Sequence, residues 1–282
     1  MIMTKNRPAI IALDYDGTLA QTNGRVGETE ISALEKLGKS GIIRVVATGR
    51  SLFSADEVMQ AELPIDYLVF SSGVGIMHWP ERNILAKNSL DVNKAGEIIN
   101  FLKESRLSFM VHHPAPDNHH FYYHEGKDRT PDFHRRIERY REFALPLEAA
   151  TGFSGISQLL VVIEYDGLHW LDKLRTQFPE VNVVRTTSPL DHSSMWIEIF
   201  PKHVSKAGGL IYLADKLGIS HDEIWCVGND YNDIDMLRFG GKSFVVNDAP
   251  DELKNEFNCI GGQDKTGVAG LLQELSARHD SL

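Results

Sequence analysis

Short apolar runs alternate with amphipathic segments near the start of this 282-residue chain. An apolar run of four to eight residues bounded by turn residues is typical of a buried strand, whereas apolar residues three or four positions apart are typical of a helix. These patterns predict strands at 9–14, 42–47 and 66–70, separated by helices at 28–39 and 52–60. Strict alternation of this kind predicts an α/β fold with a parallel sheet and helices on both faces.

The alternation changes after about residue 82 and resumes near residue 205. Between these points we expect helices near 91–104, 131–142 and 168–177, and strands at 107–113, 119–124, 158–165, 181–186 and 195–200. Beyond them we expect helices at 205–217, 231–238, 250–256 and 266–277, and strands at 223–227 and 243–247. The sequence therefore predicts a core domain made of residues 1–82 and 190–282, with an inserted α+β domain at 83–189.

Two acidic residues stand directly after the first predicted strand, in Asp14-Tyr15-Asp16-Gly17-Thr18-Leu19. On extended chain, side chains two positions apart lie on the same face, so both carboxylates can approach one point. Two like charges held that close are unfavourable unless a cation or a proton separates them. The pair suits a nucleophile, a general acid and a Mg²⁺ ion. Taken alone, the hexapeptide also fits a capped turn before a loop, so both interpretations stay open.

Four segments together resemble the motifs of the haloacid dehalogenase (HAD) superfamily of phosphatases, in the family's order. They are Asp14–Leu19, Val45-Val46-Ala47-Thr48-Gly49-Arg50, His203-Val204-Ser205-Lys206-Ala207 and Val227-Gly228-Asn229-Asp230-Tyr231-Asn232-Asp233. The long insert between the second and third motifs is similar to that of the Cof-like subclass IIB, which includes sucrose-phosphate phosphatases. The resemblance implies a Rossmann-like core and an inserted cap that covers the active site.

The resemblance also implies a role for each motif residue. Asp14 would be the nucleophile that forms an aspartyl-phosphate, and Asp16 would protonate the leaving oxygen and then activate water. Thr48 and Lys206 would neutralise and orient the transferring phosphoryl group. The Asp14 side chain and the main-chain carbonyl of Asp16 would bind Mg²⁺.

The last motif departs from the family pattern, because Asn229 stands where a metal-binding aspartate is usual. Asn229 binds Mg²⁺ through its amide oxygen, or Asp230 supplies the carboxylate after a local shift, or the site uses both. Asp233 is expected among the metal-site residues, behind the direct ligands. The remaining positions expected to bind substrate or its phosphate are Gly17, Gly49, Arg50, Ser72, Gly73 and Asn232.

A cluster of six histidines lies in the inserted section between residues 112 and 134: His112, His113, His119, His120, His124 and His134. Their spacing matches no zinc template, so contact of one or two of them with the substrate is a better expectation than a metal site. Nearby, arginines and glutamates of the expected helix at 131–142 recur with the i, i+4 spacing of a solvated helix face. The sequence thus predicts a histidine-rich inserted domain with one charged, solvated helix.

Overall charge narrows the class of partner. The formal net charge of −10 disfavours a nucleic-acid or membrane surface, and no apolar run is long enough for a membrane helix or a signal peptide. We expect a cytoplasmic monomer or small homo-oligomer that acts on a small phosphorylated metabolite, with a sugar phosphate as the family-level expectation. A phosphomutase, or a ligand-binding regulator that has lost catalysis through Asn229, are the alternatives.

Overall fold

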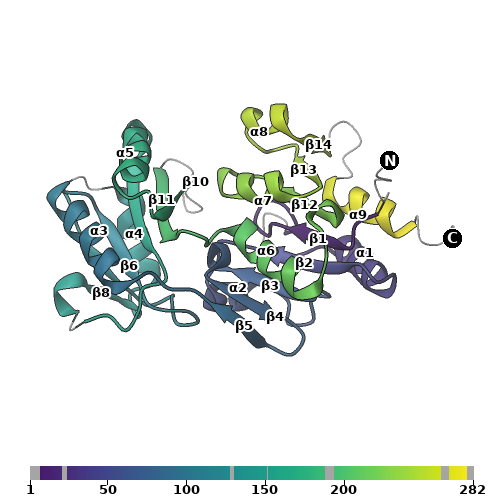
Figure 1. Ribbon diagram of the computed structural model, residues 1–282, viewed down its shortest axis with the longest axis horizontal. Helices are drawn as coiled ribbons and strands as arrows, with labels where there is room; N and C mark the ends of the chain where they lie inside the picture. The colour runs from purple at the N-terminus through teal and green to yellow at the C-terminus, as the bar shows by residue number, and fades with distance from the viewer. Residues whose placement is uncertain are drawn as a thin grey trace. The chain divides into compact units, whose positions relative to one another are not determined.

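The chain divides into two compact units in the computed structural model, which describes residues 7–20, 24–127, 130–150, 152–187, 194–261 and 267–277. Unit 1 comprises residues 1–50, 54–86 and 205–282, and unit 2 comprises residues 51–53 and 87–204 (Figure 1). Each unit has its own sheet and its own buried apolar core.

An eight-stranded sheet with the order β14-β13-β12-β1-β2-β3-β4-β5 forms the centre of unit 1. Its strands are β1 (Ile10–Leu13), β2 (Ile43–Ala47), β3 (Tyr67–Phe70), β4 (Gly75–His78), β5 (Asn83–Lys87), β12 (Ile224–Gly228), β13 (Lys242–Val246) and β14 (Asn258–Ile260). From β14 to β3 every neighbouring pair is parallel, and β4 is antiparallel to β3. The carboxyl ends of the parallel strands therefore meet at one edge of the sheet.

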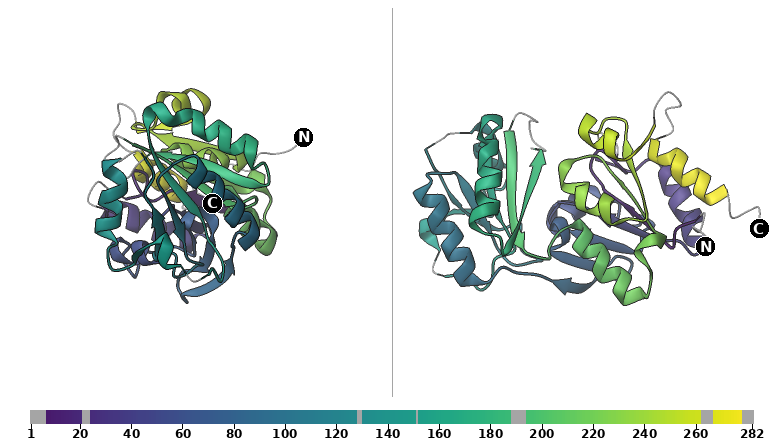
Figure 2. Two further views of the ribbon diagram at one scale, coloured as in Figure 1. Left: turned by 90° about the vertical axis from the view of Figure 1, so that its left-hand side faces the viewer. Right: turned by 45° about the horizontal axis from the view of Figure 1, so that its top comes forward.

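Helices cover both faces of this sheet. They are α1 (Glu28–Lys39), α2 (Leu52–Val58), α6 (Lys206–Leu217), α7 (Ile234–Phe239), α8 (Asp251–Glu256) and α9 (Gly267–Ala277), with 3-10 turns η1 (Ser71–Gly73), η4 (His221–Glu223) and η5 (Tyr231–Asp233). Apolar residues of α6, α7 and α8 pack on one face, and α1 and α9 lie side by side on the other (Figure 2). The α/β fold predicted from the alternating pattern is confirmed.

Unit 2 is a six-stranded sheet with the order β10-β11-β9-β6-β7-β8. Its strands are β6 (Phe109–His112), β7 (Phe121–His124), β8 (Ala144–Pro146), β9 (Leu159–Glu164), β10 (Val181–Thr187) and β11 (Ser194–Pro201). Helices α3 (Val92–Glu104) and α5 (His169–Gln177) pack on one face, and α4 (Pro131–Arg139) packs on the other. The 3-10 turns η2 (Leu147–Ala149) and η3 (Tyr165–Leu168) join these elements.

The boundaries of the units differ from those expected at 82/83 and 189/190. The chain crosses between units at 86/87 and 204/205. The second boundary lies later because β11 pairs along its whole length with β10 and also pairs with β9, so it belongs to the sheet of unit 2. Strands β4, β5, β8 and β14 were not expected from the sequence.

Hydrogen bonds lie close to the crossings on the side of each unit. In unit 1, the Tyr212 hydroxyl donates a hydrogen bond to the Leu85 carbonyl at 3.3 Å, one residue before the chain leaves. In unit 2, Nε2 of His203 lies 3.0 Å from Oδ1 of Asn88. In unit 1 the outgoing segment therefore contacts α6, and in unit 2 the outgoing and returning segments contact each other close to the crossings.

Candidate active site

Asp14 stands at the carboxyl end of β1, in the middle of the unit 1 sheet. Its backbone N–H donates to the Val227 carbonyl of the neighbouring strand β12 at 2.9 Å, which continues the parallel ladder one residue past β1. The residue is only 4 % exposed, and its Oδ2 atom is buried with no hydrogen-bond partner. A buried carboxylate oxygen without a partner is unfavourable, so this atom is available for a cation or a reacting group.

Lys206 joins two carboxylates that are far apart in the sequence. Its Nζ donates to Oδ1 of Asp14 and to Oδ1 of Asp233, both at 2.6 Å, and the side chain is 1 % exposed. Lys206 is the first residue of α6, whose N-cap Ser205 accepts a hydrogen bond from the Gly208 N–H. The cap fixes the start of the helix and so the direction in which the lysine leaves it.

Asp233 uses both of its oxygens within the protein. Oδ1 accepts from Lys206, while Oδ2 accepts the backbone N–H groups of Asn229 (2.8 Å) and Asp230 (3.0 Å). Asp230 in turn caps η5 through a reciprocal capping box with Asp233. Asp233 therefore holds Lys206 and the loop after β12 in place, with both of its carboxylate oxygens engaged.

Asn229 lies against the loop that follows Asp14. Its Oδ1 accepts a hydrogen bond from the Thr18 hydroxyl at 3.3 Å. A Cβ atom on Gly17, which has a φ of +75°, would lie only 2.5 Å from Nδ2 of Asn229. Gly17 is thus required both by its backbone angle and by the close approach of the amide.

Asp16 forms a two-point ion pair with Arg50. Nε and Nη2 of Arg50 donate to the two carboxylate oxygens, each at 2.7 Å. The Nη1 group of the same guanidinium donates to the Ser54 hydroxyl at 3.1 Å. Ser54 was not among the expected site residues, and only its position four residues after Arg50, on α2, could have indicated the contact.

The segments after β2, β3 and β12 bring four more expected residues together. Thr48 is buried, and its Oγ1 accepts the backbone N–H of Arg50 at 3.1 Å, so its hydroxyl proton can still be donated elsewhere. Ser72 is buried in a left-handed conformation (φ 53°), and its Oγ has no partner. Oγ of Ser72 and Nδ2 of Asn232 would each lie 3.7 Å from a Cβ on Gly49, so both side chains border that glycine.

Gly73 is required by the close approach of another backbone. Its φ is +98°, and a Cβ there would lie 2.2 Å from the Ser205 carbonyl oxygen, directly before Lys206. The loop after β3 and the start of α6 are therefore in tight contact within unit 1. This contact fixes the position of Lys206 relative to the loop that carries Ser72.

Burial dominates the electrostatics of the Asp14 pair. It raises the pKa of Asp14 from 3.8 to about 7, because the opposing effect of Lys206 is partly cancelled by Asp233. For Lys206, burial alone would lower the pKa, but the two carboxylates outweigh it and the pKa lies above its usual value. The ammonium is therefore charged throughout the physiological pH range, whereas the pKa of Asp14 would fall if a further cation lay nearby.

One arginine of unit 2 is arranged differently from the expectation. Among the described residues, no group of three or more His, Cys, Asp and Glu side chains is arranged to hold a metal ion. The solvated helix face expected at 131–142 is wrong for Arg136, whose guanidinium lies 4.7 Å from the centre of the Trp196 ring. The i, i+4 charge pattern did not reveal the position of Arg136. The aliphatic part of an arginine can cover apolar surface even when the other charged residues of its helix are solvated.

A family model described as haloacid dehalogenase-like hydrolase matches residues 11–272. The chain is 22% identical to the 5-amino-6-(5-phospho-D-ribitylamino)uracil phosphatase YwtE of Bacillus subtilis, over 94% of this chain and 97% of that protein. It is 24% identical to an HMP-PP phosphatase of Enterobacter, over 89% of this chain and 88% of that protein. The solved structure of SMU.1108c from Streptococcus mutans superimposes with a TM-score of 0.77 at 18% identity, covering 96% and 99% of the two chains.

The helices of the chain were also considered as membrane-spanning segments. In the described ranges, no helix has the length and apolar character that crossing a bilayer requires.

Proposed function

The chain belongs to the haloacid dehalogenase-like hydrolases, and we propose on this basis that it is a Mg²⁺-dependent phosphatase of a small phosphorylated metabolite, with sugar phosphates as the first class to test. The observation that carries the proposal is the state of Asp14. One of its oxygens is held by Lys206, and the other is buried without a partner at the end of β1. A carboxylate held this way presents one oxygen for attack on phosphorus.

In the proposed reaction, Oδ2 of Asp14 attacks the phosphorus atom and the bond to the ester oxygen breaks. Asp16 gives a proton to that oxygen as it leaves, and in the second step takes a proton from the water that cleaves the aspartyl-phosphate. Lys206 keeps Asp14 in the orientation for attack, and the Thr48 hydroxyl donates to a phosphoryl oxygen. Arg50, which is anchored to Ser54, positions the Asp16 carboxylate.

The donor set also fits a magnesium ion. The carboxylate of Asp14, the main-chain carbonyl of Asp16 and the amide oxygen of Asn229 are hard oxygen donors on loops that meet in unit 1. We propose Asn229 as the direct ligand in preference to Asp230, whose carboxylate caps η5. Bound there, Mg²⁺ would neutralise charge on the phosphoryl group. Asp233 would act only by holding the loop, because both of its oxygens are engaged.

Phosphate release tests the proposal. The substrates are a panel of sugar phosphates, the ribityl phosphate ester named for the Bacillus relative, and 4-nitrophenyl phosphate, each with Mg²⁺ or with a chelator. We expect release that requires Mg²⁺ and that falls at least about a thousandfold in Asp14→Asn. An Asp215→Asn variant, changed at an exposed position on α6, is the matched control.

Each alternative gives a different result in the same assay. A phosphomutase would produce an isomerised sugar phosphate with little free phosphate. A ligand-binding regulator would bind phosphate esters without turnover at any Mg²⁺ concentration, and the neutral Asn229 is the observation that favours it. Release that is unaffected by Asp14→Asn would refute the assignment of the nucleophile.

A further inference from the structure

Asp235, the second residue of α7, holds the beginning of α6, although it was not among the expected site residues. Its Oδ2 accepts the backbone N–H of Ala207 at 3.3 Å. Burial raises the pKa of Asp235, and the Ser205 hydroxyl, which hydrogen-bonds to the carboxylate, is the strongest of the groups that oppose the rise. Asp235 is therefore bound to the residue before Lys206 and to the residue after it.

These hydrogen bonds satisfy donors that a helix leaves free at its N-terminus. The first N–H groups of an α-helix have no acceptor within the helix itself. In α6, the Gly208 N–H donates to Oγ of the N-cap Ser205 at 3.0 Å, and the Ala207 N–H donates to Asp235. Ser205 accepts from its own helix and donates to Asp235, so the cap of α6 and the first turn of α7 form one network.

Asp233 and Asp235 hold the two ends of Lys206. Oδ1 of Asp233 accepts from Nζ at 2.6 Å, whereas Asp235 binds the chain on either side of the lysine backbone. Only Ile234 separates the two aspartates. A single short segment therefore fixes both the point where the lysine stem begins and the point where its ammonium lies.

Two other contacts hold the start of α6 from the side of the sheet. A Cβ on Gly73 would lie 2.2 Å from the Ser205 carbonyl oxygen, and a Cβ on Gly209 would lie 2.4 Å from Cγ1 of Val69 on β3. Asp235 supplies the contact from α7, which lies beside α6 in unit 1 (Figure 1). The direction in which the lysine leaves the helix is therefore fixed from two sides.

We propose that Asp235 is a positioning residue for Lys206. By fixing the first turn of α6, it keeps the ammonium between Asp14 and Asp233, where the lysine orients the nucleophile. Without Asp235, the Ala207 N–H loses its acceptor, and the first turn must shift to find another. The kinetic consequence rests on the proposed function, but the position of the ammonium can be measured without turnover.

Kinetics test the effect on the reaction. Asp235→Ala removes the acceptor, Asp235→Asn keeps an amide oxygen in the place of Oδ2, and Asp215→Ala is the control at an exposed position on α6. We expect Asp235→Ala to lower kcat for the best phosphate ester by about tenfold to a hundredfold, since misplacing a reacting group by about 1 Å can cost about a hundredfold. Asp235→Asn should recover most of this loss, because the hydrogen bond from α6 is retained. Normal kcat in Asp235→Ala would overturn the proposal.

A double-mutant cycle distinguishes positioning from a general loss of stability. If Asp235 acts through Lys206, Asp235→Ala should have little further effect on kcat once Lys206→Met has been made. A residue that only stabilised the fold would lower kcat by the same factor in both backgrounds. Additive losses would therefore overturn the proposal.

A signal from the lysine itself separates this inference from the proposed function. In protein labelled with ¹⁵N at lysine, the Nζ signal of Lys206 is assigned by its loss in Lys206→Met. It should shift in Asp235→Ala and stay in place in Asp215→Ala. An unchanged signal in Asp235→Ala would overturn the positioning role even if turnover fell. A shifted signal in a protein that releases no phosphate from any ester would keep the positioning role and reject the phosphatase.

A second variant covers the case that Asp235→Ala does not fold. Ser205→Gly removes the hydroxyl that donates to Asp235, while glycine is accepted at a helix N-cap with only a small loss of stability. The Lys206 signal should shift in this variant as well. An unchanged signal in folded Ser205→Gly would overturn the proposal.

Discussion

Replacement of Lys206 by methionine tests the central arrangement of unit 1. Methionine fills most of the space of the lysine stem but leaves Asp14 and Asp233 buried without their shared cation. Removing one partner of a buried ion pair costs about 3–5 kcal/mol. Since 1 kcal/mol corresponds to roughly 2–4 °C in a domain of 150–250 residues, we expect the melting temperature of unit 1 to fall by on the order of 10 °C.

The loss should depend on pH and on magnesium. The pKa of Asp14 is raised in the folded protein from 3.8 to about 7, and loss of the ammonium would raise it further. A carboxyl group with a raised pKa binds more protons in the folded state, so its unfavourable contribution grows as pH rises from its ordinary pKa through the folded value. The variant should therefore be closest to wild type near pH 5.5 and furthest from it near pH 8, where Mg²⁺ should recover part of the loss.

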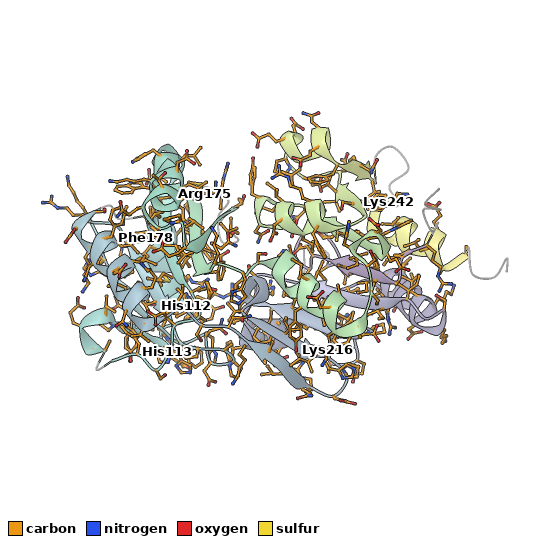
Figure 3. The ribbon with its side chains drawn as sticks, viewed as in Figure 1. His112, His113, Arg175, Phe178, Lys216 and Lys242 are labelled. Atoms are coloured by element: carbon orange, nitrogen blue, oxygen red, sulfur yellow. The ribbon has the colours of Figure 1, made fainter. Side chains whose placement is uncertain are left out.

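Melting curves by circular dichroism, recorded at both pH values with Mg²⁺ and with a chelator, measure these effects. Lys216→Met is the matched control, because Lys216 lies on the same helix but is exposed (Figure 3). If Lys206→Met melts like Lys216→Met at pH 8 without Mg²⁺, the two carboxylates do not depend on the ammonium and the reasoning fails.

Three further variants test individual contacts in unit 1. Asn229→Asp adds a negative ligand and should lower the Mg²⁺ concentration for half-maximal phosphate release by roughly tenfold; an unchanged or higher value would remove Asn229 from the metal site. Gly17→Ala and Gly41→Ala carry a similar backbone cost, since both glycines have φ between 75° and 79°, but only the first meets Asn229. Only Gly17→Ala should therefore weaken Mg²⁺ activation, and equal behaviour of the two variants would contradict the contact. Arg50→Lys cannot hold both oxygens of Asp16 and should lower kcat by about tenfold with little change in melting temperature, because the pair is partly exposed; a large stability loss with normal kcat would contradict a positioning role.

The sequence allowed the α/β alternation and most helices to be predicted, because long periodic segments leave a clear pattern. Short edge strands such as β8 and β14 left none. For the site, the pattern placed Asp14, Thr48 and Asp230 after strands, and parallel strands bring such residues to one edge. It did not indicate that Lys206 would join Asp14 to Asp233. Lys206 is 192 positions from Asp14 and 27 from Asp233, so the contact depends on how α6 packs.

The choice between Asn229 and Asp230 also depended on local backbone structure. Both residues follow β12, and nothing in their order shows that Asp230 caps η5 while Asn229 approaches Gly17. Arg136 is a similar case, since its helix carries several arginines and only the sheet beneath it shows which one lies over Trp196. Side-chain direction set by tertiary packing is what a single sequence leaves open.

The neighbouring crossings at 86/87 and 204/205 make the inserted stretch exchangeable. The Tyr212–Leu85 contact joins the segment before one cut to the helix that follows the other, and all eight strands of the sheet lie almost wholly outside the insert. A short glycine-serine linker could therefore span the gap, since domain insertion is tolerated where chain ends lie close. Over evolution, the same arrangement would allow the stretch 87–204 to be exchanged for another without rebuilding the sheet that carries Asp14.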